Sequence, residues 1–121
     1  MIQKVNLTEK FSLFSDHWQP KIAGTINDFA IKLVKIQGEF IWHHHEHEDE
    51  LFLVVKGQLR INLRDQEAIV LNAGEFVIIP HGVEHQPVAE QECEMILLEP
   101  AGTLNTGTVE NERTVKQPGT I

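Results

Sequence analysis

The chain has one cysteine, no tyrosine and no long hydrophobic run. A single thiol, Cys93, excludes an intrachain disulfide and any zinc site built on two or more cysteines. A bound metal ion would therefore need histidine and carboxylate ligands. The longest apolar runs, such as Leu51–Val55 and Met95–Leu98, fall far short of the roughly 18 residues that a membrane-spanning helix needs. No transmembrane helix is predicted.

Basic residues are scarce as well. Ten Lys and Arg stand against 18 Asp and Glu, which gives a formal net charge of −8. This charge argues against binding to nucleic acid or to an anionic membrane surface, and we expect neither as a partner. The first residues lack the apolar stretch of a secretory signal, so a cytoplasmic location is expected. A chain of 121 residues has room for one domain with one core.

Short runs rich in Val, Ile and Phe alternate with Gly, Pro, Asn and Asp along most of the chain. This pattern is typical of many short strands, and it predicts an all-β fold. A short helix is expected only within Leu7–Phe14, with Asn6 or Thr8 as its N-cap. The predicted strands are Lys21–Gly24, Phe29–Ile36, Glu39–His43, Leu51–Lys56, Leu59–Arg64, Glu67–Leu71, Phe76–Ile79, Glu84–Ala89 and Glu94–Glu99.

Some predicted strands are apolar on both faces. In Leu51–Val55 the residues of both parities are apolar, whereas a strand with one wet face would alternate. We therefore expect the second face to lie against another sheet or another subunit, and we predict a homodimer. Residues 101–121 are rich in Thr, Asn and Gly and show no period. The expected organisation is a barrel domain over residues 1–100 and an extended tail over 101–121, strapped over its own barrel or a partner's.

Histidine is the abundant residue that calls for an explanation. Four of the seven histidines lie within residues 43–47. In a strand, His43 and His45 point to the same face with Cα atoms roughly 7 Å apart, so both imidazoles can reach one ion. Glu50 follows after a turn, and His85 lies just beyond a Pro-x-Gly turn that would return the chain to the same place. Three imidazoles and a carboxylate suit Fe, Mn, Ni, Co or Zn as a divalent ion.

Two ordered segments resemble the motifs of the cupins. The first, 38–57, has a Gly, then His43-x-His45, four residues, Glu50, six residues and Gly57. The second, 74–89, has a Gly, five residues, Pro80-x-Gly82, two residues and His85. Gly38 lies one residue closer to the first histidine than is usual, and Ala89 stands where an Asn is common. Neither departure touches a ligand position.

The resemblance is to small single-domain cupins of the type-2 conserved barrel family, including a group loosely labelled mannose-6-phosphate-isomerase-like. It implies a double-stranded β-helix, that is, an antiparallel jelly-roll β-barrel, and cupins are commonly dimers. Carried over residue by residue, it implies one divalent metal ion per chain. Its ligands would be His43, His45, Glu50 and His85.

An alternative register would use His45 and His47, but Glu50 would then follow after two residues instead of four. We prefer His43 and His45, and we expect His44 and His47 at the rim. Phe52 shares the strand face of Glu50 and is the best candidate for a pocket wall. Arg60 and Arg64 are expected on a wet face, Cys93 in the core, and His81 exposed.

Four protein ligands on an ion that prefers five or six leave open positions, which is a catalytic arrangement. The sequence therefore predicts a small metalloprotein that acts as an enzyme on a small polar or sugar-like molecule. Isomerase, lyase and dioxygenase chemistry all stay open. Two alternatives remain: a non-catalytic module that binds metal or a small ligand, and a metal-free isomerase or epimerase that uses histidines as bases.

Overall fold

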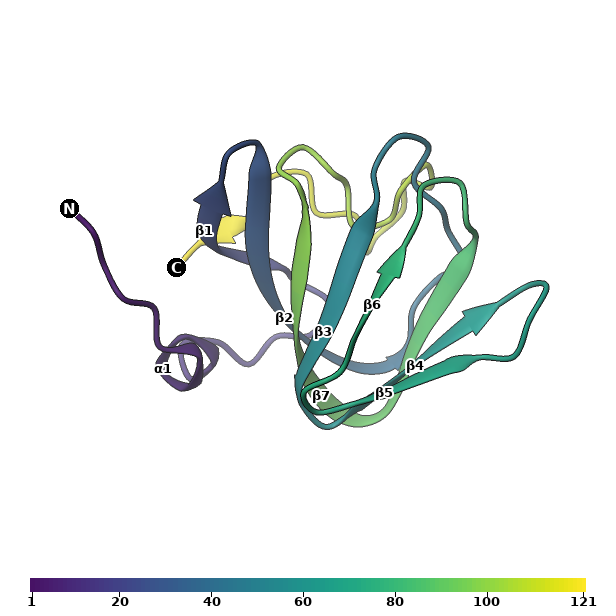
Figure 1. The fold of residues 1–121 in the computed structure, drawn as a ribbon, viewed down its shortest axis with the longest axis horizontal. Coiled ribbons are helices and arrows are strands. Elements are labelled where there is room, and N and C mark those ends of the chain that lie inside the picture. The colour runs from purple at the N-terminus through teal and green to yellow at the C-terminus, as the bar shows by residue number, and fades with distance from the viewer.

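The longest strand, β7 (His85–Pro100), lies at the centre of the fold in the computed structural model, which describes residues 1–121 (Figure 1). Its first part pairs with β4 (Gln58–Leu63), and its second part lies between β2 (Phe29–Glu39) and β3 (Glu50–Lys56). All these pairings are antiparallel. The sheet order is β5-β4-β7-β2-β1-β8, and β6 joins through β3. The remaining elements are α1 (Leu7–Phe11), β1 (Lys21–Ile26), β5 (Ile69–Asn72), β6 (Phe76–Ile79) and β8 (Gly119–Thr120).

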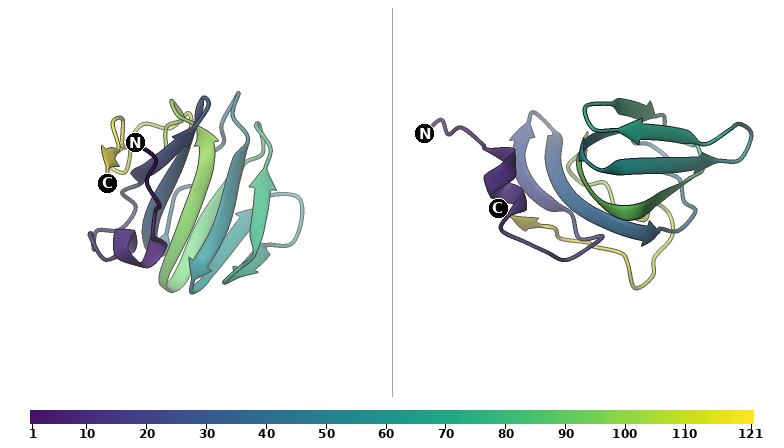
Figure 2. Two further views of the ribbon diagram at one scale, coloured as in Figure 1. Left: turned by 60° about the vertical axis from the view of Figure 1, so that its left-hand side comes forward. Right: turned by 90° about the horizontal axis from the view of Figure 1, so that it is seen from below.

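The strands curve around one interior, as the view from below shows (Figure 2). Alternate residues of each strand point inward, and these inward positions are apolar over most of the barrel. The core consists of Val34, Ile36, Phe52, Val54, Leu59, Ile61, Leu71, Ile79, Ala89, Cys93, Met95 and Leu97. The predictions of an all-β barrel and of a buried Cys93 are confirmed.

Two predicted strands differ from the observed ones. Glu39–His43 is not a strand of its own: β2 ends at Glu39, and His43 forms an isolated bridge with His85. A register shift lies between Ile36 and Gly38, where Gly38 has a φ of 90°. After it only Gly38 and Glu39 still pair with β7, and there the strand ends. The predicted strands Glu84–Ala89 and Glu94–Glu99 are parts of the continuous β7, because no Gly or Pro interrupts the residues between them.

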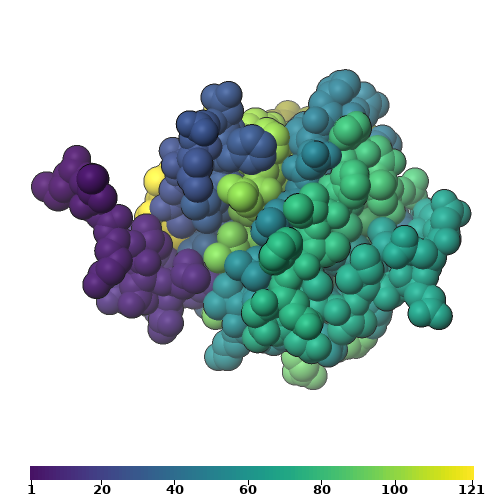
Figure 3. All heavy atoms as spheres, viewed as in Figure 1, coloured from purple at the N-terminus to yellow at the C-terminus, as the bar shows by residue number.

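The helix lies within the predicted range, and Asn6 is its N-cap: the Asn6 side chain accepts a hydrogen bond from the Glu9 N–H at 3.0 Å. The segment before it projects from the body of the molecule (Figure 3). At the other end, the tail returns from β7 to β1, where β8 pairs in parallel with Lys21 and Ile22. No helix in the structure has the length and apolar character needed to span a membrane.

Candidate metal centre

The backbone brings the two histidine segments together. His43 and His45 lie in the connection from β2 to β3, and His85 is the first residue of β7. The N–H of His43 donates to the carbonyl of His85 at 3.0 Å, and the N–H of His85 donates back at 2.9 Å. Glu50 opens β3 and points into the barrel with Phe52. His43, Glu50 and His85 are thus fixed by strand ends or by a bridge, and the carbonyl of His45 accepts from the Gly82 N–H at 2.7 Å.

The four predicted ligands form one buried cluster. Each offers a donor atom, and these atoms lie within 4.8 Å of one another. No side chain of the four is exposed by more than 4%. Nε2 of His45 and Nε2 of His85 each lie 3.4 Å from Oε1 of Glu50, and none of these three atoms has a hydrogen-bond partner. Buried polar atoms are normally paired, so three converging unpaired donors fit a metal ion.

Two hydrogen bonds set the state of the imidazoles. Nδ1 of His43 lies 3.0 Å from the Ile41 carbonyl, and Nδ1 of His85 lies 2.9 Å from the Val83 carbonyl. A carbonyl oxygen only accepts, so each Nδ1 carries the proton. In the neutral ring, Nε2 is then left with the lone pair that a metal needs.

Burial also favours the form of His43 that binds metal. Burial, followed by the charge of His85, lowers the pKa of His43 to about 4. The ring is therefore neutral at neutral pH. Burial alone would raise the pKa of Glu50, but contacts with Glu99, His45 and His85 outweigh it, and this pKa lies well below its usual range. An ionised carboxylate beside neutral imidazoles is the donor state that a divalent ion binds.

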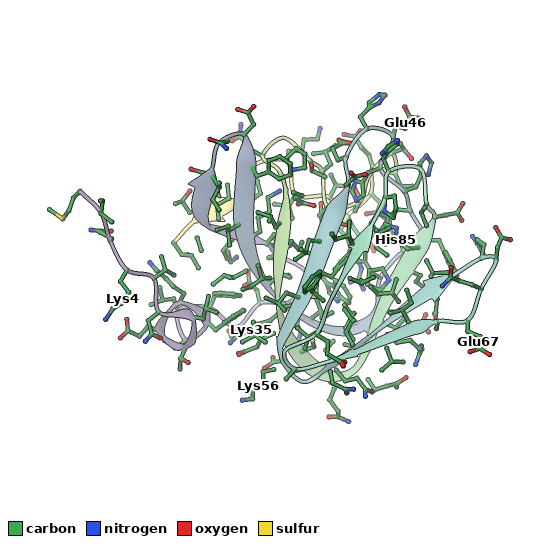
Figure 4. The ribbon with its side chains drawn as sticks, viewed as in Figure 1. Lys4, Lys35, Glu46, Lys56, Glu67 and His85 are labelled. Atoms are coloured by element: carbon green, nitrogen blue, oxygen red, sulfur yellow. The ribbon has the colours of Figure 1, made fainter.

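The other histidines lie outside this cluster. The His47 side chain is 87% exposed, with Nε2 3.9 Å from Glu46, so the structure does not bring the alternative pair of His45 and His47 together. Figure 4 shows His85 within the barrel and Glu46 on the loop that points outward. His81 is exposed as predicted, and its Nδ1 lies 3.0 Å from Asp49. His17 contacts Glu92 at 2.7 Å.

An apolar cavity adjoins the cluster. His43 and Glu50 form part of its wall, and Phe52 lines it as predicted. The cavity volume is about 40 Å³, which holds a few water molecules and is well below that of a typical drug-sized ligand site. Its other lining residues are Trp18, Pro20, Val34, Ile36, Phe40, Pro87, Met95, Leu97 and Asn105.

Sequence reasoning did not find Trp18 as part of the cavity wall. The Trp18 ring stacks on Phe40 with centroids 4.7 Å apart, and its Nε1 donates to the Gln37 carbonyl at 3.1 Å. Trp18 lies in an irregular segment before β1, and its φ is 61°. No strand period extends there, so only the fold shows the contact.

The tail covers the same side of the barrel. Asn105 lines the cavity, and its side chain bonds the backbone of Arg113 at 2.7 Å and of Val115 at 2.8 Å. The Arg113 guanidinium lies 5.3 Å from the centroid of the Trp18 ring. Gly107 packs so closely on the carbonyl of His44 that a Cβ would overlap it. The tail is thus strapped over its own barrel, one of the two arrangements expected from the sequence.

A buried pair beside the cluster was also missed. The Lys32 Nζ donates to Oε1 of Glu99 at 2.8 Å, and neither side chain is exposed by more than 2%. Burial, then the charge of Glu50 and the contact with it, raises the pKa of Glu99 well above its usual range, against the effect of Lys32. The Lys32 ammonium donates to Glu99 in either state of that carboxyl. The sequence contained one indication that Lys32 is buried, because Lys32 has the strand parity of Ala30 and Val34, which face the core.

The arginines on β4 and after it lie on the surface as expected. Nη1 of Arg60 contacts Glu90 at 3.0 Å, and Nε of Arg64 contacts Glu84 at 2.8 Å. Arg64 also lies 3.8 Å from the centroid of the Trp42 ring. These partners leave no free guanidinium to face the barrel interior.

A comparison with protein families matches the cupin domain model to residues 32–99. This match covers more than half of the chain, so the chain belongs to the cupin domain family. The fold and the resemblance to small single-domain cupins are confirmed. The narrower mannose-6-phosphate-isomerase-like label stays a prediction.

Individual relatives agree with this assignment. Uncharacterized protein YdbB of Bacillus subtilis is 43% identical over 61 residues, which are 50% of this chain and 54% of YdbB. The match thus spans about half the length of that relative. A cupin-2 domain containing protein from Shewanella frigidimarina is 50% identical with a TM-score of 0.78, over 79% of this chain and 93% of that chain.

A more distant structure shares the fold alone. Hydroquinone 1,2-dioxygenase from Sphingomonas sp., solved with 4-hydroxybenzoate bound, is 15% identical with a TM-score of 0.72. The likeness covers 80% of this chain and 32% of that chain.

Proposed function

We propose that this cupin is a metal-dependent enzyme that acts on a small molecule, with one divalent transition metal held by His43, His45, Glu50 and His85. The observation that carries the proposal is the convergence of buried donors without hydrogen-bond partners beside a cavity. Structural metal sites are closed by protein ligands and have no need of an adjoining cavity.

The ion would supply Lewis acidity toward a substrate oxygen, and an iron ion would also supply redox chemistry. The protein itself supplies orientation and a dry environment. The carbonyls of Ile41 and Val83 fix the rings of His43 and His85, and the apolar wall excludes water from the cavity. Isomerase, lyase and dioxygenase reactions are all compatible with this arrangement.

The residues of the cavity wall indicate which kind of substrate would fit. Phe40, Phe52, Met95 and Leu97 offer apolar surface, and Trp18 stacks against Phe40. Such a wall favours a small molecule with an apolar part, whose oxygens would point toward the four donors. It gives less support to the sugar-like substrate expected from the sequence, since a sugar would leave most hydroxyls unpaired there.

Elemental analysis of tag-free protein tests the metal site. The wild type is expected to hold one equivalent of a first-row metal, and His43→Ala and Glu50→Gln are expected to lose it. His44→Ala and His47→Ala are matched controls from the same loop and should keep it, because neither belongs to the donor cluster. Equal metal content in the wild type and in His43→Ala would refute the ligand assignment.

Turnover separates the enzyme from the alternatives. Metal-loaded protein is assayed against a panel of small carbonyl, enediol and phenolic compounds, with oxygen consumption recorded in parallel. Oxygen uptake would identify a dioxygenase, and oxygen-independent conversion an isomerase or lyase. Metal binding without turnover across the panel would favour a binding module. Activity that survives a chelator would favour the metal-free mechanism.

We also propose that the protein is a homodimer. An apolar band crosses the outer face of four adjacent strands, in the register β6-β3-β7-β2. Phe76 and Ile78 on β6 are 60% and 53% exposed. Figure 3 shows this face with the N-terminal segment at its side. The band consists of Ile31, Leu51, Leu53, Phe76, Ile78, Ile96 and Leu98.

Light scattering after size exclusion tests the dimer. The wild type should have twice the mass of the chain, and Phe76→Glu/Ile78→Glu should have the monomer mass. Val70→Glu, a charge at an exposed apolar residue of β5, is the control and should stay dimeric. We propose a cytoplasmic location as well, which agrees with the single reduced thiol and is checked by cell fractionation.

A further inference from the structure

A second polar group lies inside the barrel directly next to the candidate metal centre. Lys32 on β2 and Glu99 on β7 are 1% and 0% exposed, as deeply buried as the ligands themselves. Across β3 and β7, Leu51 pairs with Leu98, so the next residues along, Glu50 and Glu99, are neighbours on the inner face. Glu99 is thus the residue beside the only carboxylate of the cluster.

The contacts of Glu99 divide between its two oxygens. Oε1 accepts from Lys32 at 2.8 Å, and Lys32 also donates to the Thr103 carbonyl at 3.3 Å. Oε2 is buried and has no hydrogen-bond partner. Lys32 therefore holds one side of the Glu99 carboxyl group, and the free side is left for Glu50, its neighbour on the inner face.

Stability alone is a poor explanation for this arrangement. Burying a lysine and a carboxyl group away from water has a large desolvation penalty, and apolar replacements of such buried pairs are often neutral or stabilising. A carboxyl group that contacts a metal ligand has a different use, because such partners orient the ligand and tune its affinity for the ion.

We propose that Glu99, held in place by Lys32, is a positioning residue that fixes the orientation of the Glu50 carboxylate toward the metal. The inference rests on the proposed metal site and extends it to two residues that lie outside the donor cluster. Lys32 acts through Glu99, and its bond to Thr103 ties the pair to the start of the tail.

Titration with Co²⁺ tests this role, because the ion's visible absorption reports the geometry of its ligands independently of any enzymatic activity. In Lys32→Met/Glu99→Leu the carboxyl group beside Glu50 is lost without leaving an unpaired buried charge. The affinity for Co²⁺ should fall by about 10- to 100-fold, with a changed absorption spectrum. Glu99→Gln keeps an acceptor for Lys32 and a polar group toward Glu50, so its affinity and spectrum should stay near those of the wild type.

The outer face of the same strands provides the matched control. Lys35 on β2 lies 3.7 Å from Glu94 on β7, and it points away from the barrel interior (Figure 4). Lys35→Met/Glu94→Leu therefore removes an ion pair between the same two strands without touching Glu50. Its Co²⁺ affinity and spectrum should equal those of the wild type, whatever its melting temperature.

The possible outcomes distinguish a failure of the positioning role of Glu99 from a failure of the proposed metal site. If wild-type protein binds Co²⁺ and Lys32→Met/Glu99→Leu binds it equally well with the same spectrum, the pair is purely structural and the inference is overturned. If Glu99→Gln loses as much affinity as the double variant, the charge of the pair matters rather than the contact, and the inference again fails. If the wild type itself binds no Co²⁺, the proposed metal site is overturned and the inference with it.

Discussion

Acid should destabilise the metal-free protein through His43. Burial, followed by the charge of His85, lowers the pKa of His43 in the folded protein from the usual 6.5 to about 4. The unfolded chain takes up a proton at this residue below its usual pKa, whereas the folded chain does so only near pH 4. The stability contributed by neutral His43 is thus fully present above pH 6.5 and is lost as the pH falls toward 4.

The size of this effect follows from the two pKa values. Each pH unit between them is worth about 1.4 kcal/mol, so the free energy of unfolding should fall by about 2 kcal/mol at pH 5 and about 3 kcal/mol at pH 4. This is a large part of the roughly 5–15 kcal/mol that stabilises a typical domain. His43 is only 3% exposed, so screening by solvent does not reduce the effect much.

Urea unfolding in the presence of a chelator measures this loss at about pH 7, 6 and 5 for wild type and His43→Asn. The variant lacks the titrating ring, so its free energy of unfolding should fall less between pH 7 and pH 5 than that of the wild type, by about 2 kcal/mol. His47→Asn is a control, since the His47 side chain is 87% exposed and lies outside the donor cluster, and it should leave the profile unchanged. An identical loss of stability in wild type and His43→Asn would refute the argument.

Three further predictions concern the tail, the thiol and the metal. Gly107 and Gly74 both have positive φ, which costs an alanine about 1–2 kcal/mol, but only a Cβ at Gly107 would overlap the His44 carbonyl. Gly107→Ala should therefore make the tail more sensitive to protease than Gly74→Ala does; equal cleavage would contradict this. Burial raises the pKa of Cys93 to about 12. A thiol reagent should therefore label Cys93 at mildly alkaline pH only as fast as the protein unfolds. Faster labelling would argue against a closed core. Metal at 100 times its dissociation constant should raise the free energy of unfolding by about 3 kcal/mol in wild type but not in His43→Ala/His85→Ala.

The sequence predicted the donors because their spacing follows simple rules. The parity of a strand places His43 and His45 on one face, and the Pro-x-Gly turn before His85 returns the chain to them. The period-2 rule held even though Glu39–His43 makes no continuous ladder, since the single bridge to His85 keeps the backbone extended at His43. Local rules therefore predicted the clustering of the four side chains better than they predicted the strand that carries His43.

The cavity wall and the buried pair needed the fold. Trp18 and Asn105 reach the cavity from irregular segments, for which no period predicts a direction. Lys32 carries the inward parity of its strand, but a lysine at such a position is normally interpreted as exposed, because charged residues are seldom buried without a partner. The partner, Glu99, lies far along the chain, so only the pairing of β2 with β7 explains the burial.

In the metal-free protein the donor cluster lowers the stability of the fold, whereas the apolar core raises it. His45, Glu50 and His85 each bury a donor atom without a partner, and each such atom destabilises a fold by about 1–3 kcal/mol. The apolar side chains that surround the cluster offset this loss, so the protein folds around atoms that lack partners. A ligand for all three atoms would recover that free energy at once. The same desolvation that disfavours the empty cluster therefore drives it to bind an ion, because water cannot compete for atoms that the barrel has already excluded from solvent.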